Sequence, residues 1–300
     1  MSPAVADRTA PGASPSGGAP GDPANPNDGT DSEAVPVRPL AWRELADLPF
    51  AVLQRRIRTI AGPAGAGFAL AWGVVLGTSG SVSLLTGGSS TGNAWAAVLS
   101  TAVCAWVLRL WVTVVTVPIG LAVVTEQPIT AGAAVRRGVT VAGRLARHHL
   151  ISTLTGLGIL LLGAPLVATL LPTLIWLGRV RGRRWSVPPI LVAESAPYAA
   201  AVDRAKMLAT GRVMPLAGLW IHLRALLLVL AVPVAGLLGF LTDILGTHRW
   251  AVVTLLSGGV LLITAFAAAL DAAAGVVAYV DRRCRREGSD IRIPTGQVIR

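Results

Sequence analysis

The chain has few charged residues and almost no lysine. Only 14% of its 300 residues are charged, with Lys206 as the single lysine, whereas soluble domains carry roughly 25%. By contrast, 53% of the residues are hydrophobic, and long apolar runs recur along the chain. These runs are continuous rather than alternating, which favours membrane helices over a β-barrel. The sequence therefore predicts an all-α, polytopic helical membrane protein.

Cysteine is also scarce, which limits the chemistry that the sequence offers. Cys104 lies in an apolar run and Cys284 in a basic segment, so we expect them at different depths, without a disulfide or a metal site. Ser257 has no histidine placed to act as its base. We predict no catalytic residue, no metal and no cofactor, and hence a protein that is not an enzyme.

Positive charge is in excess, at a formal +11. The first 40 residues hold five acids and two arginines, so the excess lies in the apolar part of the chain. Arginines beside apolar spans follow the positive-inside rule, and anionic lipids are the expected counter-charge. We therefore predict the lipid bilayer as a partner and no nucleic acid. The abundance of Arg, Ala, Val and Gly is typical of a high-GC bacterial genome.

Changes in composition divide the chain into three parts. Residues 1–36 are rich in Pro, Gly and Asp, which predicts a disordered tail that is not a signal peptide. Residues 37–283 are predicted to form the helical membrane domain, and residues 284–300 a basic cytoplasmic tail. The four clearest spans are predicted at 61–85, 94–124, 214–241 and 250–280. The basic flanks predict a cell (inner, cytoplasmic) membrane with both termini in the cytoplasm.

Residues 150–178 are apolar but cannot be read as one ordinary span. Gly163, Pro165 and Pro172 interrupt them, and the basic run "RVRGRR" follows at once. A short hairpin that turns near Gly163–Pro165 returns this basic run to the inner surface, with each arm shorter than the ~20 residues of a full span. The sequence predicts about six membrane segments in all, and leaves open whether this hairpin spans fully or is re-entrant.

Amphipathic segments at 38–60, 126–149 and 185–212 predict three helices on the cytoplasmic surface. The last two contain an internal repeat, "TEQPITAGAAVRRGVTVAGR" and "AESAPYAAAVDRAKMLATGR". We expect Glu126 and Glu194 to cap the helices that follow them, and His148 and His149 to be interfacial. The arginines predicted to anchor these helices and the last span to lipid are Arg136, Arg137, Arg144, Arg204, Arg212, Arg282, Arg283, Arg285 and Arg286.

Charged residues inside the spans are the candidates for a polar site, because such charges are costly and face the bundle interior. Arg224 and Asp271 are predicted at similar depth on two adjacent antiparallel helices, and Arg109 could join them. Three interpretations stay open. The group could be a structural ion pair, a functional polar site such as a proton or substrate path or a headgroup pocket, or unpaired side chains that reach towards the surface.

Three patches carry a resemblance to known proteins. They are "RPLAWRELADLPFAVLQRR", "WSVPPILVAES" with "AVDRAKMLATGR", and "YVDRRCRREGSD". In this order they resemble the membrane domain named after glycerophosphoryl diester phosphodiesterases, and the related YciC-like bacterial membrane proteins. The resemblance implies the membrane module without the catalytic domain. The run "RVRGRR" departs from the pattern, which puts the fourth segment of that fold in doubt.

These observations lead to two functional hypotheses. The first is a non-enzymatic membrane module that acts as a scaffold or assembly partner in bacterial cell-envelope maintenance, with a membrane protein as partner. The alternative is a transporter or lipid-handling protein that uses Arg109, Arg224 and Asp271. The internal repeat favours the alternative slightly, because repeats often build transport pathways.

Overall fold

The computed structural model describes residues 39–163, 167–244 and 249–288. Within them the chain forms ten α-helices and one 3₁₀ turn, and no strand. The predicted disordered tail, the turn at Pro165 and residues 289–300 lie outside the described residues.

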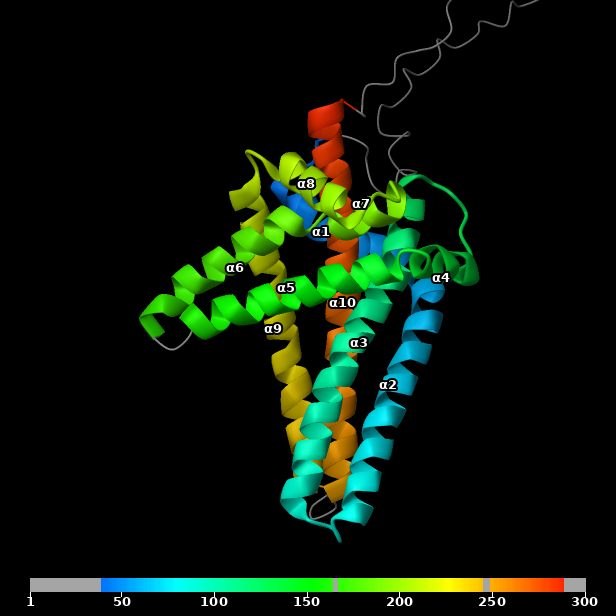
Figure 1. Cartoon of the computed structure of the whole chain (residues 1–300), viewed down its shortest axis with the longest axis vertical. Helices are drawn as coiled ribbons and strands as arrows, with labels where there is room; N and C mark the ends of the chain where they lie inside the picture. The colour runs from blue at the N-terminus through cyan, green and yellow to red at the C-terminus, as the bar shows by residue number, and fades with distance from the viewer. Residues whose placement is uncertain (1–38, 164–166, 245–248, 289–300) are drawn as a thin grey trace, which may run out of the picture. The chain divides into compact units, whose positions relative to one another are not determined.

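Four long helices run side by side and form the body of the described structure (Figure 1). They are α2 (Ile57–Leu85), α3 (Ser90–Val124), α9 (Val213–Ile244) and α10 (Arg249–Glu287). Each exceeds the ~20 residues that a bilayer requires, and each contains one of the four predicted spans. The prediction of these four spans is confirmed by helices of sufficient length and hydropathy.

Close packing in this bundle joins α3 to α10. The second half of α3 is almost wholly buried, from Val114 to Val123. A Cβ atom added to Gly120 would lie 3.2 Å from Val276 on α10. Small residues allow two helix backbones to approach in this way, and α10 supplies them in the run "AAALDAAAG". This contact leaves little room for α10 to slide along α3. It therefore fixes the position of Asp271 relative to α3.

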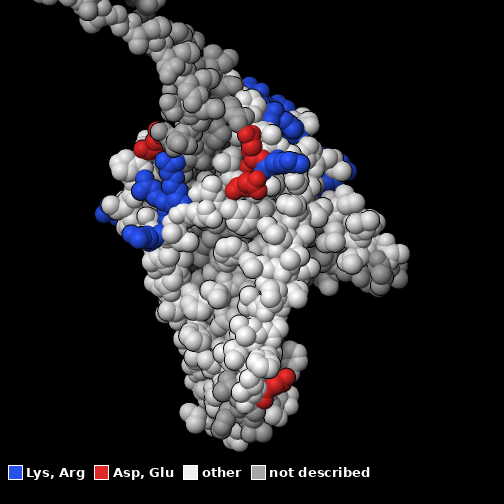
Figure 2. All heavy atoms as spheres, turned by 180° about the vertical axis from the view of Figure 1, so that it is seen from behind, with Lys and Arg blue, Asp and Glu red and all other residues white. Residues whose placement is uncertain are grey.

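Four short helices gather at the end of the bundle where α3 and α10 finish (Figure 1). They are α1 (Trp42–Arg55), α4 (Ala131–Val139), α7 (Val187–Ala193) and α8 (Tyr198–Ala209), and we call this region the short-helix end. Figure 2 shows most of the visible charged side chains over this end, above a long band of uncharged surface. Such a band matches the part of a protein that contacts lipid tails.

A helical hairpin projects from the side of the bundle, at a large angle to the long helices (Figure 1). Its arms are α5 (Ala142–Gly163) and α6 (Leu170–Arg184), with the 3₁₀ turn Val167–Thr169 before the second arm. Among the described residues, five helices are long and apolar enough to cross a membrane: α2, α3, α5, α9 and α10. The chain is thus an all-α, polytopic membrane protein, as predicted.

The second interfacial helix differs from its prediction. Over 126–149 the sequence predicts one helix, but α4 has only nine residues, and residues from Ala142 onward belong to α5. The reason is the tight packing of α4, because a Cβ atom at Gly138 would overlap the backbone carbonyl of Val114 on α3. A two-residue turn at Thr140 and Val141 follows this contact directly, and the second half of the predicted helix joins the hairpin.

The predicted caps are also wrong. The hydroxyl of Thr130, not the carboxylate of Glu126, accepts a hydrogen bond from the backbone N–H of Ala133 at 3.3 Å. The N-cap of α8 is Pro197, which has no side-chain acceptor. Glu194 instead accepts hydrogen bonds from Arg204 and from the Tyr279 hydroxyl, at 2.8 and 2.9 Å. It therefore ties α8 to α10.

The basic segment at the end of α10 contacts other parts of the protein. The helix continues past Asp281 to Glu287. The Asp281 carboxylate accepts hydrogen bonds from the backbone N–H of Leu40 and from Arg285, both at 2.8 Å, and Arg285 also donates to the Leu40 carbonyl at 2.6 Å. This clamp fixes the entry to α1 against the end of α10. Arg282 is only 1% exposed, so its prediction as a lipid anchor is wrong.

Other predicted anchors also have protein partners. Arg204 and Arg283 pair with Glu287, each closer than 3 Å. Arg144 donates to the backbone carbonyls of Ser195 and Ala196, and Arg286 to that of Thr210. Arg144, Arg204 and Arg286 thus contact other segments of the protein, whereas the Glu287 partner of Arg283 lies on the same helix. Arg136 and Arg137 are exposed and Arg212 is partly exposed, so for them lipid contact stays a prediction.

We expect Gly138→Ala to lower stability, because the new methyl group must displace the Val114 carbonyl or α4 itself. Overpacking of this kind costs about 1–3 kcal/mol, which corresponds to several degrees in apparent melting temperature. Gly132→Ala in the same helix is the matched control, since a Cβ atom there meets nothing within 4 Å. Melting curves in detergent that coincide for the two variants would contradict the tight α3–α4 contact.

Candidate functional site: an arginine-lined cavity around Asp271

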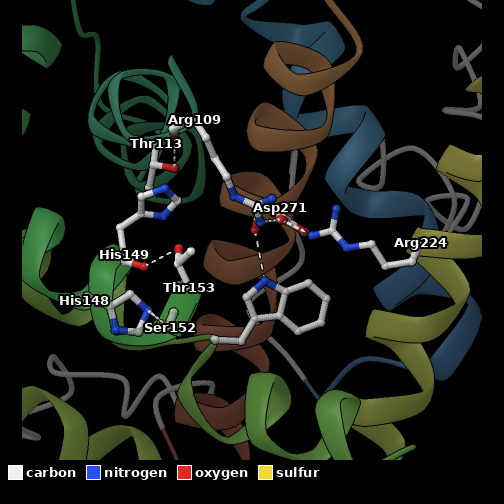
Figure 3. Close-up of polar contacts among 9 residues, drawn as sticks. Arg109, Thr113, His148, His149, Ser152, Thr153, Arg224 and Asp271 are labelled. Atoms are coloured by element: carbon white, nitrogen blue, oxygen red, sulfur yellow. Dashed lines mark hydrogen bonds and ion pairs between the residues drawn. The ribbon is translucent and has the colours of Figure 1, made fainter. Parts of the chain in front are cut away.

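Asp271 on α10 joins two arginines from two other helices. Its Oδ2 atom accepts hydrogen bonds from Nη2 of Arg109 on α3 and from Nη2 of Arg224 on α9 (Figure 3). The three side chains are 15%, 34% and 26% exposed. The Arg224 guanidinium also lies over the Trp220 ring, 5.2 Å from its centre. The structure therefore brings all three predicted site residues together, in one group rather than one pair.

The end of the hairpin is connected to the same point of α10. The indole N–H of Trp185, directly after α6, donates to the backbone carbonyl of Asp271 at 3.1 Å. One turn further, a Cβ atom at Gly275 would lie 3.1 Å from the Trp185 carbonyl. Because Gly275 has no side chain, Trp185 at the end of the hairpin can pack against α10, beside the Asp271 carboxylate.

A cavity of about 90 Å³ lies between the hairpin and the bundle. This is space for about three liquid water molecules, comparable to one phosphate or carboxylate group. Five helices supply most of its wall, with further residues from α7 and Trp185. The polar lining residues are Arg109 and Thr113 of α3, His148, His149, Ser152 and Thr155 of α5, Arg181 and Arg184 of α6, and Asp271 of α10.

Arg181 and Arg184 enter the cavity from α6. Spacing of three residues puts them on one helix face, and a Cβ atom at Gly156 on α5 would lie 2.7 Å from Nη2 of Arg181. The missing side chain at Gly156 therefore makes room for this guanidinium. Burial, together with the nearby Arg109 cation, lowers the pKa of Arg181 to about 10. The side chain stays charged at neutral pH, in surroundings that disfavour its charge.

The two adjacent histidines of α5 also line this cavity (Figure 3). The His149 ring packs on Trp106, with ring centres 4.8 Å apart, and the His148 ring lies 3.5 Å from the Ser152 hydroxyl. Nδ1 of His148 and Nε2 of His149 are buried and have no hydrogen-bond partner within the described protein. Both histidines thus face a cavity, which the sequence did not predict, and their position at the membrane interface stays a prediction. They became cavity residues because their segment belongs to α5.

The charges around the cavity do not balance. Among the described residues there, Arg109, Arg181, Arg184 and Arg224 face a single acid, Asp271, which already binds two of them. Buried charges are costly unless they are paired. Guanidinium groups and unpartnered imidazole nitrogens together form a site suited to an anion. No group of three or more metal-ligating side chains occurs in the part of the chain that the structure describes.

Sequence reasoning missed Arg181 and Arg184 as members of the site. It interpreted "RVRGRR" as a flanking cluster, because several arginines directly after an apolar run usually mark a membrane surface. A signal was present in the sequence. The segment contains four arginines and no acid, and two of the four share a helix face with Leu177, Thr173 and other positions that become buried.

Comparison of the chain with models of known protein families, with curated proteins and with solved structures found no match. The resemblance to the phosphodiesterase membrane domain therefore stays a prediction. What the site can do is argued from its own residues.

We expect Asp271→Asn to destabilise the protein, because it leaves Arg109 and Arg224 unpaired in the bundle. Breaking a buried ion pair costs about 3–5 kcal/mol, and the partial exposure of these side chains places the effect at or below the lower end of this range. Adding Arg224→Ala should recover part of the loss. Asp243→Asn, at an exposed position near the opposite end of α9, is the control. Equal melting temperatures for Asp271→Asn and wild type would show that the carboxylate does not hold the helices.

Proposed function

We propose that this protein binds an anionic group in the cavity beside Asp271 and thereby handles an acidic lipid or solute within the membrane. The observation that supports this function best is the excess of arginine charge around one small cavity. Arg109, Arg181 and Arg184 line it with Asp271 as the one acid among the described lining residues. A bound anion with one or more negative charges would reduce this excess of positive charge.

The chemistry of the side chains favours an oxyanion over other anions. Each guanidinium presents several N–H donors in a planar fork, which matches the oxygens of phosphate and carboxylate groups. Ser152 and Thr155 supply hydroxyl groups in the same wall. The cavity volume of about 90 Å³ fits a headgroup-sized fragment and excludes a large solute, so any larger part of the ligand must lie outside the cavity.

Binding rather than catalysis is the task we assign to this site. Asp271 accepts from two arginines, which disfavours its protonation and makes it a weak general base. Within the described structure, the geometry gives neither histidine a serine or cysteine nucleophile to activate. The Ser152 hydroxyl lies 3.5 Å from the His148 ring nitrogen, which is at the limit of hydrogen bonding. These features support a recognition site.

The same proposal includes a bacterial cytoplasmic membrane, with the short-helix end and both termini in the cytoplasm. What supports this orientation is the concentration of arginines at the short-helix end (Figure 2), since cytoplasmic loops carry the excess of Lys and Arg. Under this orientation the cavity lies below the cytoplasmic surface, near the depth of lipid headgroups.

The scaffold hypothesis stays as the second candidate, because the exposed helices α4 and α8 offer a patterned surface to a membrane-protein partner. Native mass spectrometry after gentle extraction separates the two functions. A second polypeptide at fixed stoichiometry would support the scaffold. A single chain that carries one recurrent lipid would support the anion-binding function.

We expect inorganic phosphate and a short-chain phosphatidic acid to raise the melting temperature of the purified protein above that in sodium chloride of equal ionic strength. A ligand that binds only the folded state stabilises it by RT ln(1 + [L]/Kd), where [L] is the free ligand concentration. Arg184→Gln should weaken binding at least about tenfold, because a hydrogen bond to a charged group contributes about 1.5–3 kcal/mol.

Arg43→Gln is the matched control, since it removes one exposed positive charge on α1 and should leave both shifts unchanged. If neither phosphate nor phosphatidic acid stabilises the wild-type protein, the proposed function is wrong. If both variants lose the shift equally, the effect is general charge attraction and not the cavity.

A further inference from the structure

The second arm of the hairpin, α6, presents arginines on two opposite faces. Arg181 and Arg184 line the cavity, whereas Arg179 and Arg183 are exposed on the other side. The helix contains no acidic residue. Within the described structure, no carboxylate lies within ion-pairing distance of any of these four arginines.

The exposed face of α6 combines these two arginines with apolar side chains. Pro172, Ile175, Trp176, Arg179 and Arg183 follow each other at helical spacing and line an open groove. Trp176 is 51% exposed. The apolar residues lie towards the start of α6 and the arginines towards its end, so the groove has one apolar and one cationic part. This order matches an amphiphile with an anionic head.

Close packing prevents α6 from turning this face inward. A Cβ atom at Gly182 would lie 3.1 Å from Leu216 of α9, and one at Gly178 would lie 3.3 Å from the backbone carbonyl of Ala217. Two glycines one turn apart therefore seat α6 directly on α9. With this contact on one side and the cavity on another, Arg179 and Arg183 are held outward.

The arginines of α10 show why the charge on α6 requires another partner. There Arg283 binds Glu287 and Arg285 binds Asp281, each at 2.8 Å. The interleaved acids of α10 thus compensate its own basic residues. On α6 the compensation must come from outside the described chain, and at the edge of a membrane domain lipid phosphates are the abundant anions.

We infer that the outer face of α6 is a docking site for a glycerophospholipid. Its phosphate binds between Arg179 and Arg183, and its glycerol and acyl chains lie along Trp176, Ile175 and Pro172. This lipid site rests on the anion-binding function proposed above, and it narrows the ligand class of the cavity from any oxyanion to a phospholipid.

The two sites are connected by the helix that they share. Val180 contributes to the wall of the cavity and to the groove. Arg179 and Arg183 on one side, and Arg181 and Arg184 on the other, form a succession of phosphate-binding groups around α6. The cavity, at about 90 Å³, is too small for a whole lipid, so the acyl chains of a lipid whose headgroup enters it must stay outside.

The test uses the full-length protein and native mass spectrometry after extraction from vesicles that contain phosphatidylglycerol and phosphatidylcholine. We expect the wild-type chain to retain phosphatidylglycerol, and the double variant Arg179→Gln/Arg183→Gln to lose at least about nine-tenths of it. The control is Arg43→Gln/Arg58→Gln, which removes the same charge from exposed positions on α1 and α2 and should retain the lipid. All of these positions are exposed, so each variant should keep the wild-type melting temperature.

The outcomes separate this inference from the proposed function. If the α6 variant retains as much phosphatidylglycerol as the wild type, the lipid site in the groove is wrong. It is also wrong if the α6 variant and the control variant lose equal amounts of this lipid. A dimer that the α6 variant disrupts would assign the groove to a second copy of the chain and overturn the lipid site. In each case, the part of the stabilisation by inorganic phosphate that Arg184→Gln removes reports on the cavity. Its survival in the α6 variant supports the inner site, whereas its absence in the wild type overturns the proposed function.

Discussion

The arrangement of the long helices depends on one carboxylate. Asp271 receives Arg109 from α3 and Arg224 from α9, so three helices meet through a single acidic group within the apolar bundle. Breaking such a contact would leave an unpaired arginine in the bundle, which is costly in free energy. The contact is therefore strong. One carboxylate cannot neutralise the arginines that surround it, however. The same interaction that holds the bundle therefore leaves a positively charged cavity beside it.

Two further features keep this geometry in place. Gly120 of α3 lets Val276 of α10 pack against it, and this close contact helps to hold α3 where Arg109 reaches Asp271. At the short-helix end, Asp281 and Arg285 clamp the backbone of Leu40. Two acids on α10 thus have different tasks. Asp271 organises the spanning helices and the cavity, while Asp281 fixes the first helix to the end of the last one.

Much of this structure could be predicted from the sequence, because hydropathy and length identify membrane helices directly. The four long helices, the hairpin after residue 150 and the meeting of Arg224 with Asp271 all follow from spacing and depth. The roles of the arginines outside the spans could not be predicted in this way. Arg282 faces inward and Arg285 binds the distant Leu40, which depends on tertiary packing. Likewise, the position of His148 and His149 on the cavity wall depends on how the hairpin packs against the bundle.

The most direct test of this account is an experimental density map of the protein in nanodiscs that contain phosphatidylglycerol, at a resolution that shows side chains. The account predicts non-protein density in the cavity, within hydrogen-bonding distance of the guanidinium groups of Arg181 and Arg184. A map in which these side chains are well resolved and the cavity is closed, or holds only ordered water, would contradict the central claim that the excess of arginine charge is there to bind an anion.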